Sequence, residues 1–187
     1  MIRPELVIAP DIQIEPLKTT DVGGLVSILR EHVRDPNTGE VLESEVQEIQ
    51  GYMHGEKDGY GRARKYVVAR GADGRVCGCM AYVFPPDPDI INLFKWDFKR
   101  DPEHSAQLLN AFVSGSLARG GGVGKKLFKE ICRMVQKEGK RELWVSSSLR
   151  YIDSWGFYDK MCDENKGFFF GGGWSHSDAN IWLKRLD

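Results

Sequence analysis

A glycine-rich stretch at residues 119–126 contains residue types that can together bind an anion. It reads Arg-Gly-Gly-Gly-Val-Gly-Lys-Lys and lies between an apolar run at 108–114 and a segment whose apolar residues recur every three or four positions. This pattern predicts a strand, a glycine loop and the start of a helix. Glycines let the backbone approach a ligand closely, and the N–H groups and dipole of a helix start favour phosphate. The stretch therefore predicts a phosphate-binding loop, with an ordinary glycine turn before an amphipathic helix as the alternative.

Two well-known phosphate-binding motifs do not fit this spacing. A Walker A loop needs glycine five residues before Gly124, where Arg119 stands, and a hydroxyl that binds magnesium where Lys126 stands. A dinucleotide motif of the form G-x-G-x-x-G would need glycine at Lys125 or at Leu127. A nucleotide-binding enzyme is therefore the weaker interpretation of the loop.

Length and composition indicate one globular domain. The chain has 187 residues, of which 41% are hydrophobic, and no repeat or linker divides it, so we predict a single domain over 11–187 after a loose leader at 1–10. Basic and acidic residues are nearly balanced, at 26 and 27, which argues against a nucleic-acid partner. Apolar runs are too short to span a membrane, and residues 1–5 lack the apolar core of a signal peptide. We therefore expect a cytoplasmic protein that does not bind membranes.

The four cysteines give no metal-binding or disulfide pattern. Cys77 and Cys79 form a lone Cys-x-Cys without a second ligand pair, and Cys132 and Cys162 stand apart from them. We predict that Cys77 and Cys79 are small strand residues facing one side of a sheet. No metal is expected, and the thiols are expected to be reduced.

The spacing of apolar residues predicts strands and helices along the whole chain. Thr19-Thr20-Asp21 can cap the first helix, and Asp73-Gly74 is the turn of a hairpin. The segment 85–105 is predicted either as an extra strand or as a lid over a pocket. The other elements follow in the order strand, helix, helix, three strands, helix, strand, helix, strand, strand, over residues 12–17, 22–33, 42–53, 66–69, 76–84, 108–114, 123–135, 142–146, 155–161, 167–170 and 181–183.

This order of elements resembles the GCN5-related N-acetyltransferase (GNAT) family over nearly the whole chain. Arg119–Gly124 fits the family's Arg/Gln-x-x-Gly-x-Gly/Ala loop at every fixed position, and it follows the fourth strand as in the family. Phe157-Tyr158-Asp159-Lys160 is similar to the family's Phe/Leu-Tyr-Glu/Asp-Lys stretch. The resemblance implies the mixed α/β fold of the acyl-coenzyme A N-acyltransferases, with a mostly antiparallel central sheet flanked by helices.

The resemblance also implies a site for acetyl-coenzyme A in a V-shaped gap between the fourth and fifth strands. The pantetheine arm would meet the backbone of the fourth strand, and the pyrophosphate would meet the loop amides. Lys125 and Lys126 would either pair with phosphate or be solvated lysines at a helix start. The implied cofactor-binding residues are Phe112, Val113, Ser114, Arg119, Gly120, Gly121, Gly122, Val123, Gly124 and Lys125.

The implied reaction transfers an acetyl group from a thioester to a primary amine by direct attack through a tetrahedral intermediate. An amine is protonated near neutral pH, so a base must first remove a proton, directly or through water. A backbone N–H on the fourth strand can stabilise the oxyanion. Tyr158 matches the family's tyrosine, the general acid for the leaving thiolate, with packing against coenzyme A as the alternative.

Two positions depart from the family. The fourth strand begins with 107–110, Gln-Leu-Leu-Asn, where many members carry a glutamate base. Tyr151 stands where the family often has asparagine. Coenzyme contacts after the fifth strand are therefore expected from serines. The upstream residues that could reach a water, or be ordinary loop charges, are Asp97, Glu103 and His104, and the serines are Ser146, Ser147 and Ser148.

The sequence does not identify the amine that would accept the acetyl group. In the family, the first two helices and the later loops wall the acceptor site. An acidic lining here would favour a small cationic amine over a protein lysine or N-terminus, with a solvated helix face as the alternative. A coenzyme-binding sensor or partner-binding module with little catalysis is the second interpretation, and both a monomer and a homodimer stay open. The acidic residues are Asp35, Glu40, Glu43, Glu45 and Glu48, and the aromatic ones are Trp96, Tyr151, Trp155 and Trp174.

Overall fold

The computed structural model describes residues 11–93, 102–115, 122–170 and 178–186. Several predictions fall outside these ranges. They concern the leader at 1–10, the aromatic and acidic residues Trp96, Asp97 and Trp174, the loop residues Arg119, Gly120 and Gly121, and the glycines at 171–173.

The described residues form one sheet of seven strands in the order β1-β2-β3-β4-β5-β7-β6. All neighbouring strands are antiparallel except β4 and β5, which are parallel. This is the mixed, mostly antiparallel sheet that the sequence predicts. The strands are β1 (Gln13–Pro16), β2 (Lys65–Arg70), β3 (Val76–Val83), β4 (Ser105–Val113), β5 (Glu142–Ser148), β6 (Glu164–Phe169) and β7 (Ala179–Arg185).

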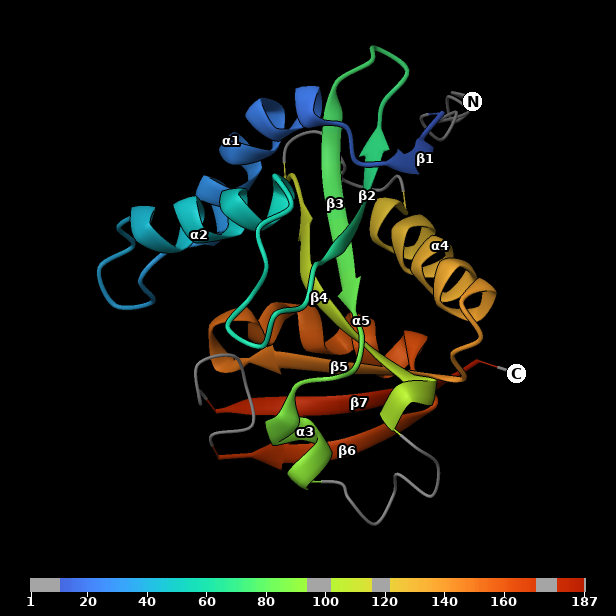
Figure 1. Cartoon of the computed structure of the whole chain (residues 1–187). Coiled ribbons are helices and arrows are strands. Elements are labelled where there is room, and N and C mark those ends of the chain that lie inside the picture. The colour runs from blue at the N-terminus through green and yellow to red at the C-terminus, as the bar shows by residue number, and fades with distance from the viewer. Residues whose placement is uncertain (1–10, 94–101, 116–121, 171–177, 187) are drawn as a thin grey trace, which may run out of the picture.

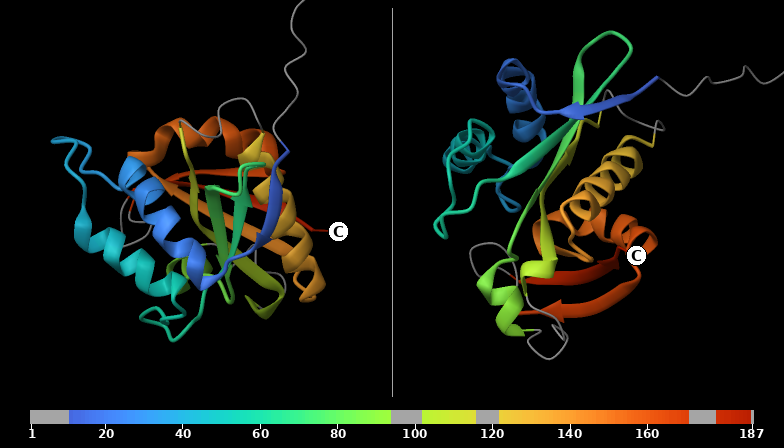
Figure 2. Two further views of the ribbon diagram at one scale, coloured as in Figure 1. Left: turned by 90° about the horizontal axis from the view of Figure 1, so that it is seen from above. Right: turned by 45° about the vertical axis from the view of Figure 1, so that its right-hand side comes forward.

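Helices cover both faces of the sheet, as Figure 1 shows. Their apolar residues pack into two large clusters on opposite faces of β2–β4, with α1 and α2 on one face and α4 on the other (Figure 2). The α-helices are α1 (Val22–His32), α2 (Glu43–Met53), α3 (Pro88–Leu93), α4 (Val123–Lys137) and α5 (Trp155–Met161), and short 3-10 turns are η1 (Thr19–Asp21), η2 (Pro102–His104) and η3 (Leu149–Ser154). None of the described helices is long and apolar enough to cross a membrane.

Helix α4 shows how the sequence pattern becomes packing. Its buried side chains recur at the predicted spacing of three and four: Val123, Leu127, Phe128, Ile131 and Val135. The helix is preceded by Gly122, whose φ of 64° is the left-handed conformation that glycine adopts readily. At the other end, Gly139 has a φ of 75°. Positive-φ glycines therefore stand at both ends of α4.

The segment 85–105 contains helix α3, which the sequence prediction missed. The sequence predicts only an extra strand or a lid there. Asp87, however, acts as a helix cap, because its Oδ1 accepts from the N–H of Asp89 at 2.9 Å, and proline is favoured at the first helical position. Ile90 of this helix packs against the strands β5 and β7. The extra element is therefore a helix on the C-terminal part of the sheet.

The prediction that Cys77 and Cys79 face one side is wrong. Ala69 pairs with Gly78 and Arg70 with Val76, so Cys77 is an extra residue in a β-bulge. The bulge breaks the alternation of side chains, and the two cysteines enter different core clusters. Both thiols are buried and free.

Candidate active site

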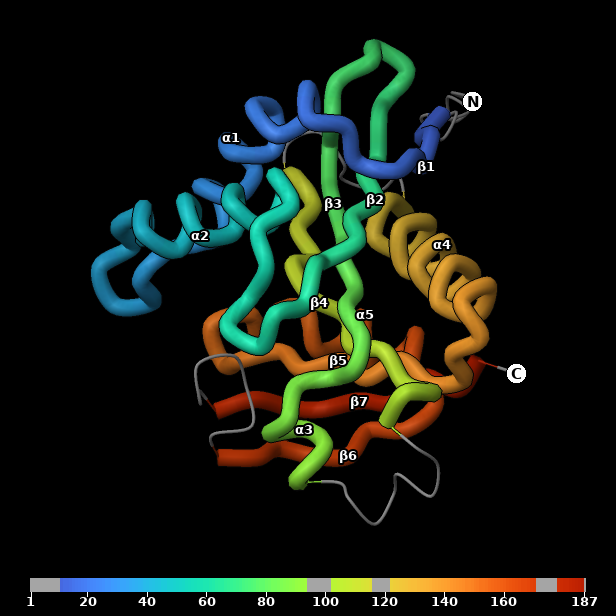
Figure 3. Tube along the Cα trace, viewed as in Figure 1, coloured from blue at the N-terminus to red at the C-terminus, as the bar shows by residue number. Residues whose placement is uncertain are grey.

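The parallel strands β4 and β5 pair only at their beginnings. Ser105–Leu108 lies opposite Glu142–Val145, and beyond these residues β4 continues along β3 while β5 continues along β7. Figure 3 shows the two strands diverging. The sheet therefore opens between them, as the family resemblance implies.

A distortion in β4 lies where this opening begins. Asn110 and Ala111 together lie opposite Met80, and Asn110 has a φ of 47°, unusual for a residue other than glycine. The Asn110 side chain holds the distortion, because its Oδ1 accepts hydrogen bonds from the Tyr66 hydroxyl at 2.9 Å and from Nη1 of Arg64. The bulge interrupts regular pairing at the centre of the cleft.

A cavity of about 1010 Å³ follows the opening. Leu108–Val113 lines its middle. We call its two ends the α4 side and the α2 side. The α4 side is lined by Gly124, Ser146, Ser147, Ser154, Phe157 and Tyr158, and the α2 side by Glu31, His32, Glu45, Glu48, Ile49, Arg64, Arg150 and Tyr151.

The first turn of α4 brings backbone groups to the α4 side. Lys126 N–H already donates to the carbonyl of Gly122, at 3.0 Å, as the first bond of the helix. The N–H groups before it have no such partner within a helix, so they form the polar end predicted to hold phosphate. A side chain at Gly124 would meet the ring of Phe157, since a Cβ there lies 3.6 Å from Cε2. Val123 is buried and Lys125 is exposed.

Tyr158 lies on the same side and comes from α5. Its side chain is only 5% exposed, and its ring centroid lies 5.3 Å from those of Phe157 and Trp182. Burial, with a smaller effect of Cys162, raises the pKa of the Tyr158 hydroxyl. The phenol therefore stays protonated at neutral pH and can act as a proton donor within the cavity.

The predicted contacts at the end of β4 are only partly accessible. The Ser114 N–H donates to the carbonyl of Cys77 at 2.9 Å, so it is used within the sheet, and the Phe112 side chain is buried. The Val113 carbonyl accepts from Nε2 of His32 at 2.8 Å. Glu31 receives hydrogen bonds from Ser114 Oγ at 3.1 Å and from the N–H of residue 115 at 3.0 Å. The end of α1 therefore holds the end of β4.

The acidic residues of α2 divide between the cavity and the surface. Glu43 forms an exposed ion pair with Arg30 at 3.0 Å and does not line the cavity. Glu45 binds Arg150 at 2.7 Å, and Glu48 accepts from the Tyr52 hydroxyl at 2.5 Å. The cavity is therefore not uniformly acidic, because Arg64 and Arg150 line the same side.

Two other acidic residues singled out in the sequence lie in the turn between α1 and α2. The N–H groups of Thr38 and Asn37 hold the pKa of Asp35 below its usual range, so this carboxylate caps a turn. Glu40 belongs to the same turn, where its carbonyl accepts from the Asp35 N–H at 2.8 Å. Neither residue lines the cavity.

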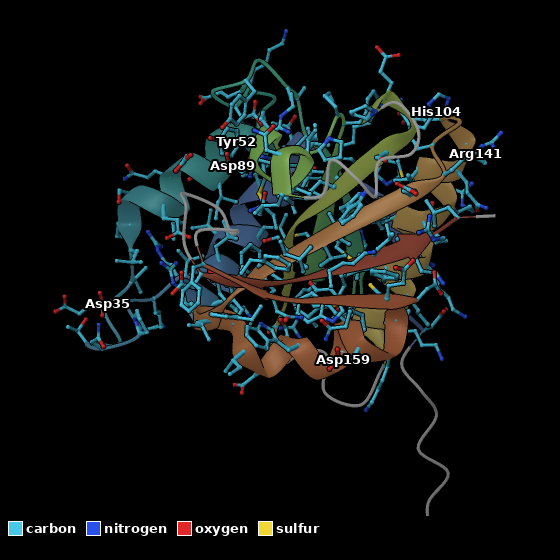
Figure 4. All side chains as sticks on the ribbon, turned by 90° about the horizontal axis from the view of Figure 1, so that it is seen from below. Asp35, Tyr52, Asp89, His104, Arg141 and Asp159 are labelled. Atoms are coloured by element: carbon cyan, nitrogen blue, oxygen red, sulfur yellow. The ribbon has the colours of Figure 1, made fainter. Side chains whose placement is uncertain are left out.

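Of the upstream residues considered as bases, the two that the structure describes, Glu103 and His104, do not line the cavity. The His104 carbonyl accepts from the Arg141 N–H at 2.8 Å, and Figure 4 shows both residues at the end of the molecule opposite Asp35. Glu103 stands next to His104 at the start of β4, and neither lines the cavity. Gln107 is buried and accepts from the Asp87 N–H at 2.7 Å. These positions are structural.

Of the described aromatic residues expected near the acceptor, only Tyr151 lines the cavity. Trp155 packs instead against Trp182 and Phe168, with ring centroids 5.9 and 6.1 Å away. Its indole lies in the core cluster that contains α4. Ser146, Ser147 and Ser148, expected to contact a ligand after β5, all line the cavity.

Among the cavity residues not singled out in the sequence, five bear polar or charged side chains from distant segments. They come from the end of α1, the residue before β2, the bulge of β4 and the turn η3, and no local motif marks them. They become neighbours only through the sheet and its helices. These residues are Glu31, His32, Arg64, Asn110 and Arg150. Within the described ranges, no group of three or more His, Cys, Asp or Glu side chains could hold a metal ion.

Comparisons with known proteins agree with this architecture. The family model described as "Acetyltransferase (GNAT) family" matches residues 26–163. A GNAT-family acetyltransferase from Staphylococcus aureus superposes with a TM-score of 0.65 at 12% identity, covering 94% of this chain and 99% of the other. A GCN5-related N-acetyltransferase from Kribbella flavida gives 0.62 at 17% identity, with 94% and 98% covered. An aminoglycoside 6'-acetyltransferase type Ii gives 0.64 at 17% identity, with 94% and 97% covered. No curated protein sequence matches the chain.

Proposed function

We propose that this chain, which belongs to the GNAT family of acetyltransferases, transfers an acetyl group from acetyl-coenzyme A to the primary amine of a small molecule. One observation carries this proposal: the gap between β4 and β5 continues into a cavity lined by both the first turn of α4 and Tyr158. An anion-binding helix start and a protonated phenol thus share one cavity. Together these two features suit a thioester donor with a phosphorylated carrier.

The α4 side fits coenzyme A. The backbone from Gly122 to Lys125 would hold the pyrophosphate, because helix-start N–H groups bind phosphate and the absence of a Cβ at Gly122 and Gly124 leaves the approach open. Ser146 and Ser147 line the opposite wall and can donate hydrogen bonds to the pantetheine arm. Arg119, Gly120 and Gly121 complete the proposed loop.

The proposed chemistry joins the amine nitrogen to the thioester carbonyl carbon. A backbone N–H of the β4 bulge stabilises the oxyanion of the tetrahedral intermediate. The carbon–sulfur bond then breaks, and Tyr158 donates its hydroxyl proton to the departing thiolate. The proton taken from the amine nitrogen passes to water, and water returns a proton to the phenolate. The amide and the free thiol are the products, so atoms and charge balance.

The amine must lose a proton before or during attack, and His32 is the side chain that we assign to this step. A carbonyl oxygen can only accept, so Nε2 of His32 carries the hydrogen donated to Val113, and Nδ1 of the neutral ring keeps a basic lone pair. Both oxygens of Glu31 already accept hydrogen bonds, and Glu45 is bound to Arg150. These carboxylates are already engaged with their own partners, so we assign the step to the imidazole.

The α2 side would receive the acceptor. The Glu45–Arg150 ion pair joins α2 to η3, which favours a small molecule over an extended peptide. Glu45 and Glu48 favour a cationic amine, as the sequence suggests, but Arg64 and Arg150 add equal positive charge. Charge alone therefore does not select a polyamine over other amines.

A thiol-release assay with acetyl-coenzyme A and a panel of amines tests this proposal. We expect release that depends on the amine and a matching acetylated product. Tight binding of coenzyme A without release would favour a coenzyme-binding sensor with little catalysis, the second interpretation of the sequence. No binding of coenzyme A would refute both.

A further inference from the structure

Arg64 occupies an unusual position for a charged residue. It is only 6% exposed, it directly precedes β2, and it lines the α2 side of the cavity. Arginine is always protonated, and its planar guanidinium matches a carboxylate in a bidentate arrangement. The cavity therefore has a buried, permanent positive charge on its wall.

Two neutral groups fix the direction of this guanidinium. Nη1 of Arg64 donates to Oδ1 of Asn110, and the guanidinium carbon lies 3.6 Å from the centroid of the Tyr52 ring. The Tyr52 hydroxyl in turn donates to Glu48 at 2.5 Å. The Tyr52 ring holds one face of the guanidinium and Asn110 holds one edge. The Arg64 side chain is therefore already ordered, so binding a ligand costs little further side-chain entropy.

Arg64 lies close to the place where the acetyl group would react, and this position indicates which ligand group it would bind. Asn110, to which Arg64 is bonded, is the residue of the β4 bulge, where the acetyl group would react. An anionic group bound by Arg64 thus lies beside the amine that is acetylated. Two carboxylates on the α2 side have partners of their own. Glu45 pairs with Arg150, and Glu48 accepts a hydrogen bond from Tyr52.

We propose that Arg64 is the receptor for a carboxylate of the acceptor, so that the acceptor is an amino acid or a similar small molecule with its amine a few bonds from a carboxylate. This inference rests on the proposed acetyl transfer. A carboxylate fits better than a phosphate, because a single guanidinium carries one positive charge and compensates one negative charge rather than two. Ile49 and Tyr151 on the same wall suit an apolar side chain of such an acceptor.

The test compares α-amino acids with their carboxamides, which keep the amine and lose the negative charge. The wild-type protein should prefer the carboxylates about ten- to hundredfold in kcat/KM, the range of hydrogen bonds to a charged partner. Arg64→Gln should bring this ratio close to one. Arg150→Gln, which removes the other arginine of the α2 side, should keep the preference, and so should Tyr66→Phe, which removes the second donor to Asn110.

Several results would overturn the inference while leaving acetyl transfer intact. These are carboxamides acetylated as well as carboxylates, an Arg64→Gln variant that slows both equally, or a preference lost in Arg150→Gln instead. If Arg64→Gln slows acetylation of both substrates equally, the role of Arg64 is only to support the conformation of the β4 bulge through Asn110. If Arg64→Gln does not fold, inhibition of the wild-type protein by propionate and by propionamide tests the inference instead. Propionate should compete with the amine and propionamide should not, and equal inhibition would contradict the inference.

If no amine in the panel is acetylated, a binding measurement still tests whether the cavity recognises a carboxylate. Calorimetry on the protein saturated with coenzyme A should show binding of the amino acid and not of its carboxamide. That result would retain the carboxylate receptor and reject the enzyme. Equal binding of both, or of neither, would reject the receptor.

Discussion

On the α4 side of the cleft, the predicted features are a backbone turn and a tyrosine from one short helix, with serines of β5 and η3 beside them, whereas the α2 side is built from charged side chains of four separate segments. Gly122 and Gly124 contribute by lacking a side chain, and Tyr158 follows within the next helix after β5. On the α2 side, Arg64 and Arg150 are 86 positions apart in the sequence and line one cavity only because of the fold.

This difference separates a binding feature that many proteins can share from features that are particular to this chain. Backbone N–H groups at a helix start bind any phosphate, so the same turn can serve every protein that uses the same donor. Charged side chains around the other end can select a ligand by the sign and position of their charges. The predictions below remove one feature at a time from each side.

The largest effect is expected from Tyr158→Phe on the α4 side. This change removes only the hydroxyl and keeps the ring packed against Phe157 and Trp182, so coenzyme affinity should stay nearly unchanged. Turnover should fall by about 10²–10⁴-fold, as for loss of a general acid. Steady-state kinetics with calorimetry of coenzyme binding measures both.

Tyr151→Phe is the matched control, because Tyr151 is the other tyrosine lining the cavity. It should slow turnover far less. Equal rates for wild type and Tyr158→Phe would reduce Tyr158 to a packing residue.

The next largest effect is expected from Gly122→Val. A β-branched residue at a φ of 64° is strained, and its side chain would stand where the phosphates approach. The dissociation constant of coenzyme A should rise at least about tenfold, equivalent to about 1.4 kcal/mol. Calorimetry on the folded variant measures it.

Gly139→Val controls for strain, since Gly139 has a φ of 75° at the opposite end of the same helix. Both variants should lose about 1–2 kcal/mol of unfolding free energy, but only Gly122→Val should lose affinity. Equal affinity in the two variants would place the pyrophosphate elsewhere.

A smaller effect is expected on the α2 side from Glu45→Gln. Its ion pair with Arg150 is partly exposed, and such pairs contribute about 0.2–1 kcal/mol. The KM of a basic amine should rise by about two- to fivefold, and the rise should shrink in 1 M salt, where the Debye length is about 3 Å. Glu43→Gln should change nothing, because Glu43 pairs with Arg30 outside the cavity. A larger change in Glu43→Gln would contradict the division of α2 into two faces.

The smallest effect concerns pH. Burial raises the pKa of Tyr158, so the proton donor persists at a pH where a free tyrosine, with a pKa of about 10, would be half ionised. Turnover should therefore not fall by more than about twofold as the pH rises to 10. Because the native state then keeps a proton that the unfolded chain loses, unfolding free energy should fall as pH rises above about 10. An alkaline limb at or below pH 10 that Tyr158→Phe lacks would contradict this.

The sequence predicted the features that depend on neighbours in the chain. Spacing of three and four marked the buried face of α4, and the hairpin turn at Asp73-Gly74 joins β2 to β3. The stretch around Tyr158 is helical, as expected. These signals are local, so a pattern or a short motif reveals them.

The features that were missed depend on contacts between distant segments. Asparagine gives no sign of a φ of 47° until Arg64 and Tyr66 are seen to hold its side chain. The bulge at Cys77 depends on pairing with β2, which its own spacing does not encode. His32 belongs to the cavity because α1 ends beside β4. Residue type alone did not distinguish these side chains from surface ones.

Product analysis of a single reaction tests the central claim most directly. The protein is mixed with acetyl-coenzyme A carrying an isotopic label in the acetyl group and with the amine panel, and thiol release and labelled amide are both quantified by mass spectrometry. We expect one labelled amide for each thiol released, and loss of both in Tyr158→Phe while coenzyme A still binds. Thiol release without labelled amide, or coenzyme binding with neither product, would contradict acetyl transfer to an amine in this cleft.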